Sequence, residues 1–232
     1  MLKNTLINRL ATIKIANALG ELKQEVVFVG GAMVSLYIDD TAAEDIRPTK
    51  DIDLTFQITT ANKLEILREK LIEKGFKQSH EEDVICRFHY DDLKVDVMST
   101  QAVGWAPSNK WFEQGFEAAI PIRLENIEIK ILTLPYFLAT KMEAFFDRGV
   151  KDLYKSHDFE DIIYLFNHTS TIVEQILNTE ENLKAYLQFS VKEIVNNKRI
   201  LTVIPGHLYF ENIDERLQLI LDRMNRIIDT VN

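Results

Sequence analysis

Three aspartates lie in two apolar segments of the sequence, at a spacing that could support metal-ion chemistry. Asp51 and Asp53 begin the segment D-I-D-L-T-F, and Asp96 lies within L-K-V-D-V-M. Side chains alternate between two faces along a strand, so Asp51 and Asp53 share one face while Ile52 and Leu54 face the core. Neighbouring carboxylates repel each other, so we expect a cation between them, and oxygen ligands suit Mg²⁺ or Mn²⁺.

Asp96 leaves two interpretations open. Its neighbours Val95 and Val97 share the opposite face of a predicted strand. A lone aspartate in such a strand is most simply a solvent-exposed charge, because charged residues are mostly exposed. Beside Asp51 and Asp53, it could instead complete a set of three carboxylates that holds two divalent ions and acts as a base for an incoming hydroxyl.

A Gly-Gly pair, Gly30-Gly31, separates a buried strand expected at residues 25–29 from a helix expected at residues 32–38. Glycine leaves the backbone N–H groups bare at this point, so a phosphate can approach them closely at the start of the helix. The alternative is a tight corner between strand and helix that binds no ligand.

Lys141 lies in the middle of a largely apolar helix expected from Thr133 to Arg148. A lysine among apolar neighbours usually extends along them until its ammonium group reaches water. The functional alternative is a point charge that binds a triphosphate.

The composition is that of an ordinary globular protein. The chain has 232 residues, 46% of them hydrophobic and 27% charged, with a formal net charge of -9, which gives no overall basic surface for nucleic acid. Its one cysteine, Cys86, excludes a disulfide within the chain. The N-terminal residues lack the apolar core of a signal peptide, and no run of about 18 apolar residues occurs. We therefore expect a cytoplasmic protein with no membrane span.

The predicted elements change in kind near residue 132. Before it, the pattern predicts strands at residues 25–29, 51–57, 84–90, 93–99, 118–124 and 127–132, and helices at residues 2–19, 32–38 and 61–74. After it, helices are predicted at residues 133–148, 155–167, 182–195 and 213–231. We therefore expect an α/β half at residues 1–132 and a helical C-terminal domain at residues 133–232.

Two local expectations concern packing. The first helix carries a predicted apolar stripe of Leu6, Leu10, Ile13 and Ala16. Residues 100–116 read as a loop with several aromatic side chains, which can stack on a base or, as we prefer, pin the loop to the body of the protein.

The first motif resembles that of a known family. G-G-A-M-V-S-L-Y followed by R-P-T-K-D-I-D-L looks like the AbiEii-type nucleotidyltransferases, the toxins of type IV toxin–antitoxin systems, within the superfamily that includes polymerase β. That family pairs a glycine turn with an Arg-x-Ser/Thr-x-Asp-x-Asp strand. The positions that match are Gly30, Gly31, Arg47, Thr49, Asp51 and Asp53.

Looser matches follow later in the chain, and the resemblance covers most of residues 26–165. Lys141 and Arg148 follow the family's lysine-to-arginine helix pattern, and Asp158 and Asp161 fit an acidic helix that usually begins with Arg-Asp. This sequence departs from that pattern, because His157 stands where the arginine is expected. Asp96 matches the third acid of the family.

The resemblance implies a nucleotidyltransferase core with a mixed sheet, and Mg²⁺-dependent transfer of a nucleotidyl group from an NTP to an acceptor hydroxyl. It implies nucleotide contacts at Gly30, Gly31, Arg47, Thr49, Lys141 and Asp158, and metal ligation by Asp51, Asp53 and Asp96. It makes tRNA the first acceptor to test and a cognate antitoxin a partner to seek. Two alternatives stay open: transfer to a small molecule such as an aminoglycoside, and a fold relative that binds a nucleotide or a partner without turnover.

Overall fold

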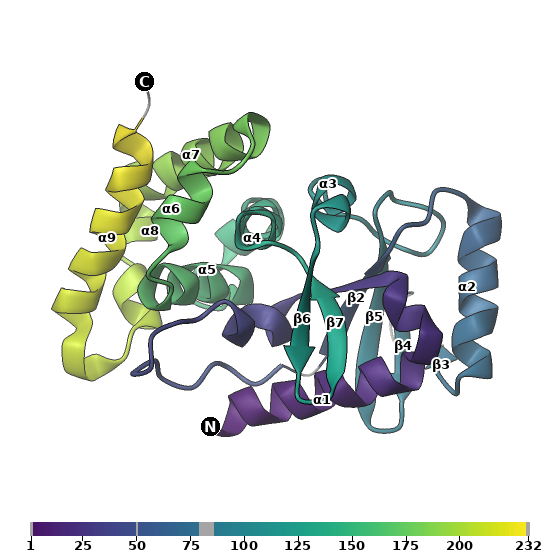
Figure 1. Cartoon of the computed structure of the whole chain (residues 1–232). Coiled ribbons are helices and arrows are strands. Elements are labelled where there is room, and N and C mark those ends of the chain that lie inside the picture. The colour runs from purple at the N-terminus through teal and green to yellow at the C-terminus, as the bar shows by residue number, and fades with distance from the viewer. Residues whose placement is uncertain (1, 50, 79–85, 231–232) are drawn as a thin grey trace. The chain divides into compact units, whose positions relative to one another are not determined.

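The computed structural model describes residues 2–49, 51–78 and 86–230, which form two compact units (Figure 1). The first, which we call the sheet unit, contains Met1–Ser35 and Asp45–Thr133. The second, the helical unit, contains Leu36–Glu44 and Leu134–Asn232. No helix within the described ranges has the length and apolarity that crossing a membrane requires.

The sheet unit is built on seven strands: β1 (Val26–Val29), β2 (Asp51–Phe56), β3 (Lys77–Gln78), β4 (Arg87–Tyr90), β5 (Leu93–Ser99), β6 (Ile120–Leu124) and β7 (Ile127–Ile131). They form one sheet in the order β3-β4-β5-β2-β1-β7-β6. β1–β7 and β2–β5 are parallel pairs, and the other pairs are antiparallel. This mixed sheet confirms the predicted fold class.

The two hairpins predicted in this half are present. β4 and β5 turn through Asp91, and β6 and β7 turn through Glu125, each with a φ of 51°. The strand expected at residues 84–90 is described from Arg87 onward, and residues 84 and 85 lie outside the described residues.

The first helix, α1 (Lys3–Leu19), buries only part of the predicted stripe: Ala16 is buried, but Leu6 and Leu10 are not. Its buried side chains include Asn8, Thr12 and Ile15, whereas Leu6 and Leu10 are 40% and 51% exposed. The prediction was wrong for these two leucines because polar side chains of α1 make hydrogen bonds on the buried face, which apolar periodicity does not register. α1 packs against β2 and β7.

The remaining helices of the sheet unit are η1 (Gly20–Gln24), η2 (Gly31–Leu36), α2 (Ala61–Glu73) and α3 (Phe112–Glu117). The helix expected at residues 32–38 is a short 3-10 helix, η2, because the chain passes into the helical unit at Leu36. The expected loop at residues 100–116 contains the start of α3. Trp111 and Phe112 there are only 4% exposed, so they pin this segment to the unit as preferred.

The helical unit contains α4 (Leu134–Arg148), η3 (Gly149–Lys151), α5 (His157–His168), α6 (Ile172–Leu177), α7 (Glu181–Asn196), α8 (Lys198–Leu201), η4 (Ile204–His207), η5 (Phe210–Asn212) and α9 (Ile213–Asp229). α4 packs on α5 and α7, while α9 packs on α5, α6 and α7 (Figure 1). The helical C-terminal region is thus present as predicted. Residue 231, the expected end of the last helix, lies outside the described residues.

Candidate active site

The three acids share one face of the sheet where β2 lies beside β5. Parallel pairing of these strands places Asp53 opposite Asp96, and Asp51 opposite Lys94. The three carboxylate side chains are half-buried, whereas the residues that alternate with them are buried: Ile52, Leu54, Val95 and Val97. Strand alternation therefore brings Asp51, Asp53 and Asp96 together on the less buried face.

Gly30 allows the Asp53 carboxylate to lie directly against the turn after β1. Val29 pairs with Asp53 in the ladder of β1 and β2, and Gly30 has a φ of 74°. A Cβ atom at Gly30 would overlap the Asp53 carboxylate. A positive φ and this close approach both require glycine at the position.

Gly31 lies against the segment that leads into β2. A Cβ atom at Gly31 would be 2.5 Å from Arg47 Nη2 and 2.8 Å from Thr49 Cγ2. The structure therefore brings the glycine turn, Arg47, Thr49 and Asp53 to one corner of the sheet unit. A guanidinium group beside bare backbone provides the positive surroundings that suit a phosphate.

α1 holds this corner through contacts that the sequence analysis missed. Asp45 accepts hydrogen bonds from the backbone N–H groups of Asn4, at 2.7 Å, and Thr5, at 3.0 Å. Asn8 Oδ1 accepts one from Thr49 Oγ1 at 3.0 Å. Burial alone would raise the pKa of Asp45, but the hydrogen bonds from Asn4 and Thr5 outweigh burial and lower it. Because about 40 residues separate the partners, no local pattern signals these contacts.

Arg87 is a second residue that the sequence analysis missed. Its Nε and Nη2 atoms each lie 2.7 Å from an oxygen of Asp96, and Nη2 is also 3.1 Å from Asp51 Oδ2. Arg87 and Asp96 are paired residues in the β4–β5 hairpin. A signal did exist, because counting back from the predicted Asp91-Asp92 turn places Arg87 opposite Asp96.

The donor set fits a hard divalent cation in its chemistry. Three carboxylates share one face, and the absence of a Cβ atom at Gly30 makes room for the Asp53 carboxylate itself. The Arg87 guanidinium supplies a positive charge between Asp51 and Asp96. Within the described part of the chain, no three His, Cys, Asp or Glu side chains converge closely enough to hold one metal ion together. The three carboxylates thus have the chemistry of divalent-cation ligands and lie on the same face of the sheet, and Arg87 contacts two of them.

Lys141 and Asp158 lie in the helical unit, where they contact each other. Lys141 is only 6% exposed, and its Nζ atom lies 2.7 Å from Asp161 Oδ2 and 3.3 Å from Asp158 Oδ1. Lys141 therefore does not extend to water. Arg148 bonds the other oxygen of Asp158 at 2.8 Å. Burial raises the pKa of Asp158, but the charges of Lys141 and Arg148 outweigh burial, so the pKa is lowered.

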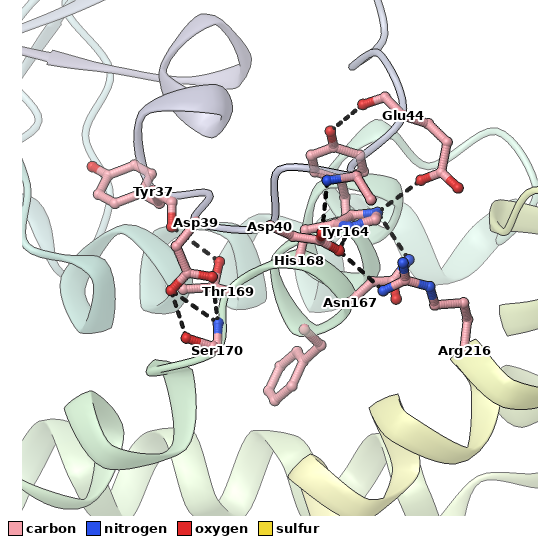
Figure 2. Close-up of polar contacts among 12 residues, drawn as sticks. Tyr37, Asp39, Asp40, Glu44, Tyr164, Asn167, His168, Thr169, Ser170 and Arg216 are labelled. Carbon is pink, nitrogen blue, oxygen red and sulfur yellow. Dashed lines mark hydrogen bonds and ion pairs between the residues drawn. The ribbon is translucent and has the colours of Figure 1, made fainter.

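A buried histidine in the helical unit binds the segment Leu36–Glu44, as Figure 2 shows. His168 is 1% exposed, and its two ring nitrogens each lie 3.0 Å from a carboxylate, Nδ1 from Asp40 and Nε2 from Glu44. Arg216 from α9 contacts the same Asp40 oxygen at 3.1 Å. The hydrogen bond to His168 lowers the pKa of Asp40 to about 2, against burial and with help from the Ala42 amide and Arg216.

Further hydrogen bonds hold the same segment (Figure 2). Asp39 accepts bonds from the Ser170 N–H at 2.8 Å and from its hydroxyl at 2.7 Å. The Thr169 hydroxyl donates to the Tyr37 carbonyl at 3.1 Å. The segment that joins the glycine turn to Arg47 in sequence is thus fixed to α5 and the residues after it.

Comparison with known families gives one match over nearly the whole chain. The family described as "Nucleotidyl transferase AbiEii toxin, Type IV TA system" matches residues 15–227, which confirms the resemblance seen in the first motif. No protein of curated function matches the sequence significantly.

Solved structures with a similar fold include a nucleotidyltransferase-like protein and an antibiotic-resistance factor. An antigenic nucleotidyltransferase-like protein from Paracoccidioides brasiliensis aligns with a TM-score of 0.50 and 16% identity, over 84% of this chain and 91% of that one. The antibiotic-resistance factor ANT(2'')-Ia aligns with a TM-score of 0.51 and 15% identity, over 83% of this chain and 97% of that one. At these identities, the similarity concerns the fold.

Replacing Gly30 with alanine tests its contact with Asp53. Gly30→Ala should lower the free energy of unfolding by about 2–3 kcal/mol. The backbone strain at positive φ and the overlap of the new Cβ atom with Asp53 both contribute to this loss. Gly75→Ala is the matched control, since Gly75 has a φ of 89° but a Cβ atom there would meet nothing closer than 3.8 Å. Urea unfolding measures both variants. Equal losses would contradict the contact with Asp53.

Lys141→Met should destabilise the protein by about 3–5 kcal/mol, because it leaves the buried carboxylates of Asp158 and Asp161 without their shared cation. Urea unfolding monitored by circular dichroism measures the loss. Lys155→Met serves as the control, since the Lys155 side chain is 86% exposed. A Lys141→Met variant as stable as this control would show that the ion pairs contribute little.

The Asp40 carboxylate should make stability depend on acid pH. Because its folded pKa of about 2 lies below its ordinary value of 3.8, its stabilisation is present above about pH 4 and is lost as the pH falls toward 2. Asp40→Asn should therefore be less stable than wild type by about 1–2 kcal/mol above pH 4, with the difference closing near pH 2. Urea unfolding at several pH values measures this, with Asp214→Asn as an exposed control. A difference that is constant with pH would exclude the coupling.

Proposed function

Because this chain belongs to the AbiEii family of nucleotidyl transferases, we propose that it transfers a nucleotidyl group from an NTP to an acceptor hydroxyl with the help of Mg²⁺ or Mn²⁺. The observation that carries this proposal is the placement of Asp53 beside Asp96 and directly against Gly30. Phosphoryl chemistry depends mainly on positioning and charge stabilisation. This corner offers hydrogen-bond donors for a phosphate and carboxylate ligands for a metal ion.

The sheet unit contributes the phosphate and metal side of the reaction. The backbone of Gly30-Gly31, the Arg47 guanidinium and Thr49 bind the β- and γ-phosphates, and Asn8 fixes the Thr49 hydroxyl. Asp51, Asp53 and Asp96 are the residues that would hold a divalent ion, and the ion would supply charge neutralisation for the α-phosphate and the leaving pyrophosphate.

The proton of the acceptor hydroxyl needs a base, and we assign that role to Asp96. The acceptor oxygen bonds to the α-phosphorus, the bond to pyrophosphate breaks, and Asp96 takes the proton. Arg87 contacts both oxygens of Asp96. Hydrogen bonds to a carboxylate favour its charged form, so Asp96 accepts the proton more readily once one of these contacts is released.

In the helical unit, Lys141 and Asp158 retain their proposed nucleotide-binding role. Lys141 is already paired with two carboxylates, so its charge is partly compensated. Arg148, whose side chain is 71% exposed and bonded to Asp158, is the accessible cation of this cluster. We assign Lys141 the role of fixing Asp158, which in turn holds the exposed Arg148.

The acceptor that we favour is RNA, with tRNA tested first. Arg148, the last residue of α4, and Lys151 and Lys155 after it are exposed cations available to an RNA backbone, although Asp147 and Asp152 are exposed among them. In a toxin–antitoxin setting, such transfer would inactivate the RNA, and a cognate antitoxin would oppose it. Use of NTPs is consistent with the expected cytoplasmic location.

A second candidate is transfer to a small molecule. The antibiotic-resistance factor ANT(2'')-Ia shares the fold of this chain, and the alternative acceptor that we propose is an antibiotic such as an aminoglycoside. The acidic net charge also suits a polycationic substrate.

A third hypothesis is a protein that binds nucleotide without catalysing transfer. Such a protein would bind NTP in calorimetry and leave every acceptor unlabelled.

Replacing the central acid tests the proposed activity. Asp53→Asn should lower label transfer from α-³²P-labelled NTPs by about 100-fold or more, because it removes a metal ligand next to the reacting phosphate. Parallel reactions contain total tRNA, an aminoglycoside or no acceptor, and the labelled product identifies the acceptor class. Asp92→Asn is the control, since the Asp92 side chain is 83% exposed. Equal transfer by wild type and Asp53→Asn would refute the assignment.

A further inference from the structure

Arg87 occupies the centre of the acidic face, and nothing in the nucleotidyl-transfer scheme above requires an arginine there. In the β4-β5-β2 part of the sheet, Arg87 pairs with Asp96, and Asp96 pairs with Asp53. The guanidinium group contacts Asp96 through two atoms and reaches along the same face to Asp51. Its side chain is only 14% exposed, as is that of Asp96.

The charges on this face make a cation necessary when no metal ion is bound. Asp51, Asp53 and Asp96 carry three formal negative charges at adjacent positions, and Lys94 lies opposite Asp51. Arg47 lies at the corner near Asp53, but the contacts to Asp96 and Asp51 on this face come from Arg87. Neighbouring carboxylates that cannot share a cation destabilise the folded chain or take up protons. Arg87 therefore stabilises the same arrangement of acids that a divalent ion would stabilise.

A bidentate guanidinium contact also excludes direct metal ligation by the same oxygens. Both oxygens of Asp96 accept hydrogen bonds from Arg87 at 2.7 Å. A cation bound to those oxygens would lie close to the guanidinium charge and would be repelled by it. Ligation by Asp96 and the Arg87–Asp96 pair are therefore alternatives.

We propose that Arg87 is an internal counter-cation that competes with the divalent ion for Asp96 and Asp51. Without metal, Arg87 holds the acids in place and keeps Asp96 from acting as a base. Metal binding displaces Arg87 from Asp96, so Arg87 sets the metal concentration at which the site is completed. Arg87 is thus a positioning residue, and its role rests on the metal-binding part of the proposed function.

The test measures Mn²⁺ binding to the full chain without nucleotide, by electron paramagnetic resonance of free Mn²⁺. Arg87→Gln should bind Mn²⁺ about tenfold more tightly than wild type, because the competing charge is gone. Arg87→Lys keeps the charge but not the bidentate geometry. Its Mn²⁺ affinity should lie between those of wild type and Arg87→Gln. Thermal unfolding should show a lower midpoint for Arg87→Gln without metal and a larger upward shift on adding Mn²⁺.

Two further variants make the result specific. Lys14→Gln is the matched control, because Lys14 also bridges two aspartates, Asp91 at 3.0 Å and Asp92 at 3.1 Å, in an exposed position of the same unit. It should leave Mn²⁺ affinity unchanged. Adding Asp96→Asn to Arg87→Gln should abolish the gain in affinity.

The outcomes separate this inference from the proposed function. Unchanged or weaker Mn²⁺ binding by Arg87→Gln, or no binding by either protein, overturns the role of Arg87 as a competitor. If wild type transfers label while Arg87→Gln shows no gain in affinity, only this inference fails. If Arg87→Gln gains affinity through Asp96 but wild type labels no acceptor, the competition stands and the proposed activity fails.

Discussion

Repulsion among carboxylates on one face of a sheet is the constraint on which this structure depends. Strand alternation and the parallel pairing of β2 with β5 fix Asp51, Asp53 and Asp96 on one face of the sheet. Such a group needs positive charge, and the sheet supplies it from Arg87 on the next strand. The glycine turn serves the same group, because only the absence of a Cβ atom at Gly30 leaves space for Asp53.

A second constraint comes from the course of the chain between the two parts of the motif. The glycine turn and the strand with the aspartates belong to the sheet unit, but Leu36–Glu44 between them belongs to the helical unit. His168 fixes that segment by contacts with Asp40 and Glu44. The conformation of the segment is therefore determined largely by α5 and α9, although both of its ends continue into residues of the candidate site.

The sequence predicted most reliably what depends on neighbouring residues. Alternation identified the common face of Asp51 and Asp53, and the Asp91-Asp92 turn fixed a hairpin whose register places Arg87 opposite Asp96. The contact of Asn8 with Thr49 spans 41 residues and was not predictable from local patterns. The same contact explains why the apolar stripe of α1 was misjudged, since hydrogen bonding to Thr49 turns Asn8, rather than Leu6 or Leu10, toward the interior.

Both cationic residues in the acidic clusters are largely buried, but their acidic partners differ in exposure, and this difference decides how their variants should be interpreted. The Lys141 side chain is 8% exposed and is paired with two buried acids, so its removal acts first on stability. Activity lost in a Lys141 variant therefore does not by itself identify a catalytic role. Arg87 faces Asp51, whose side chain is 35% exposed, so water and metal ions can take over part of the stabilisation. The chemistry of the site is thus more directly accessible through Arg87 than through Lys141.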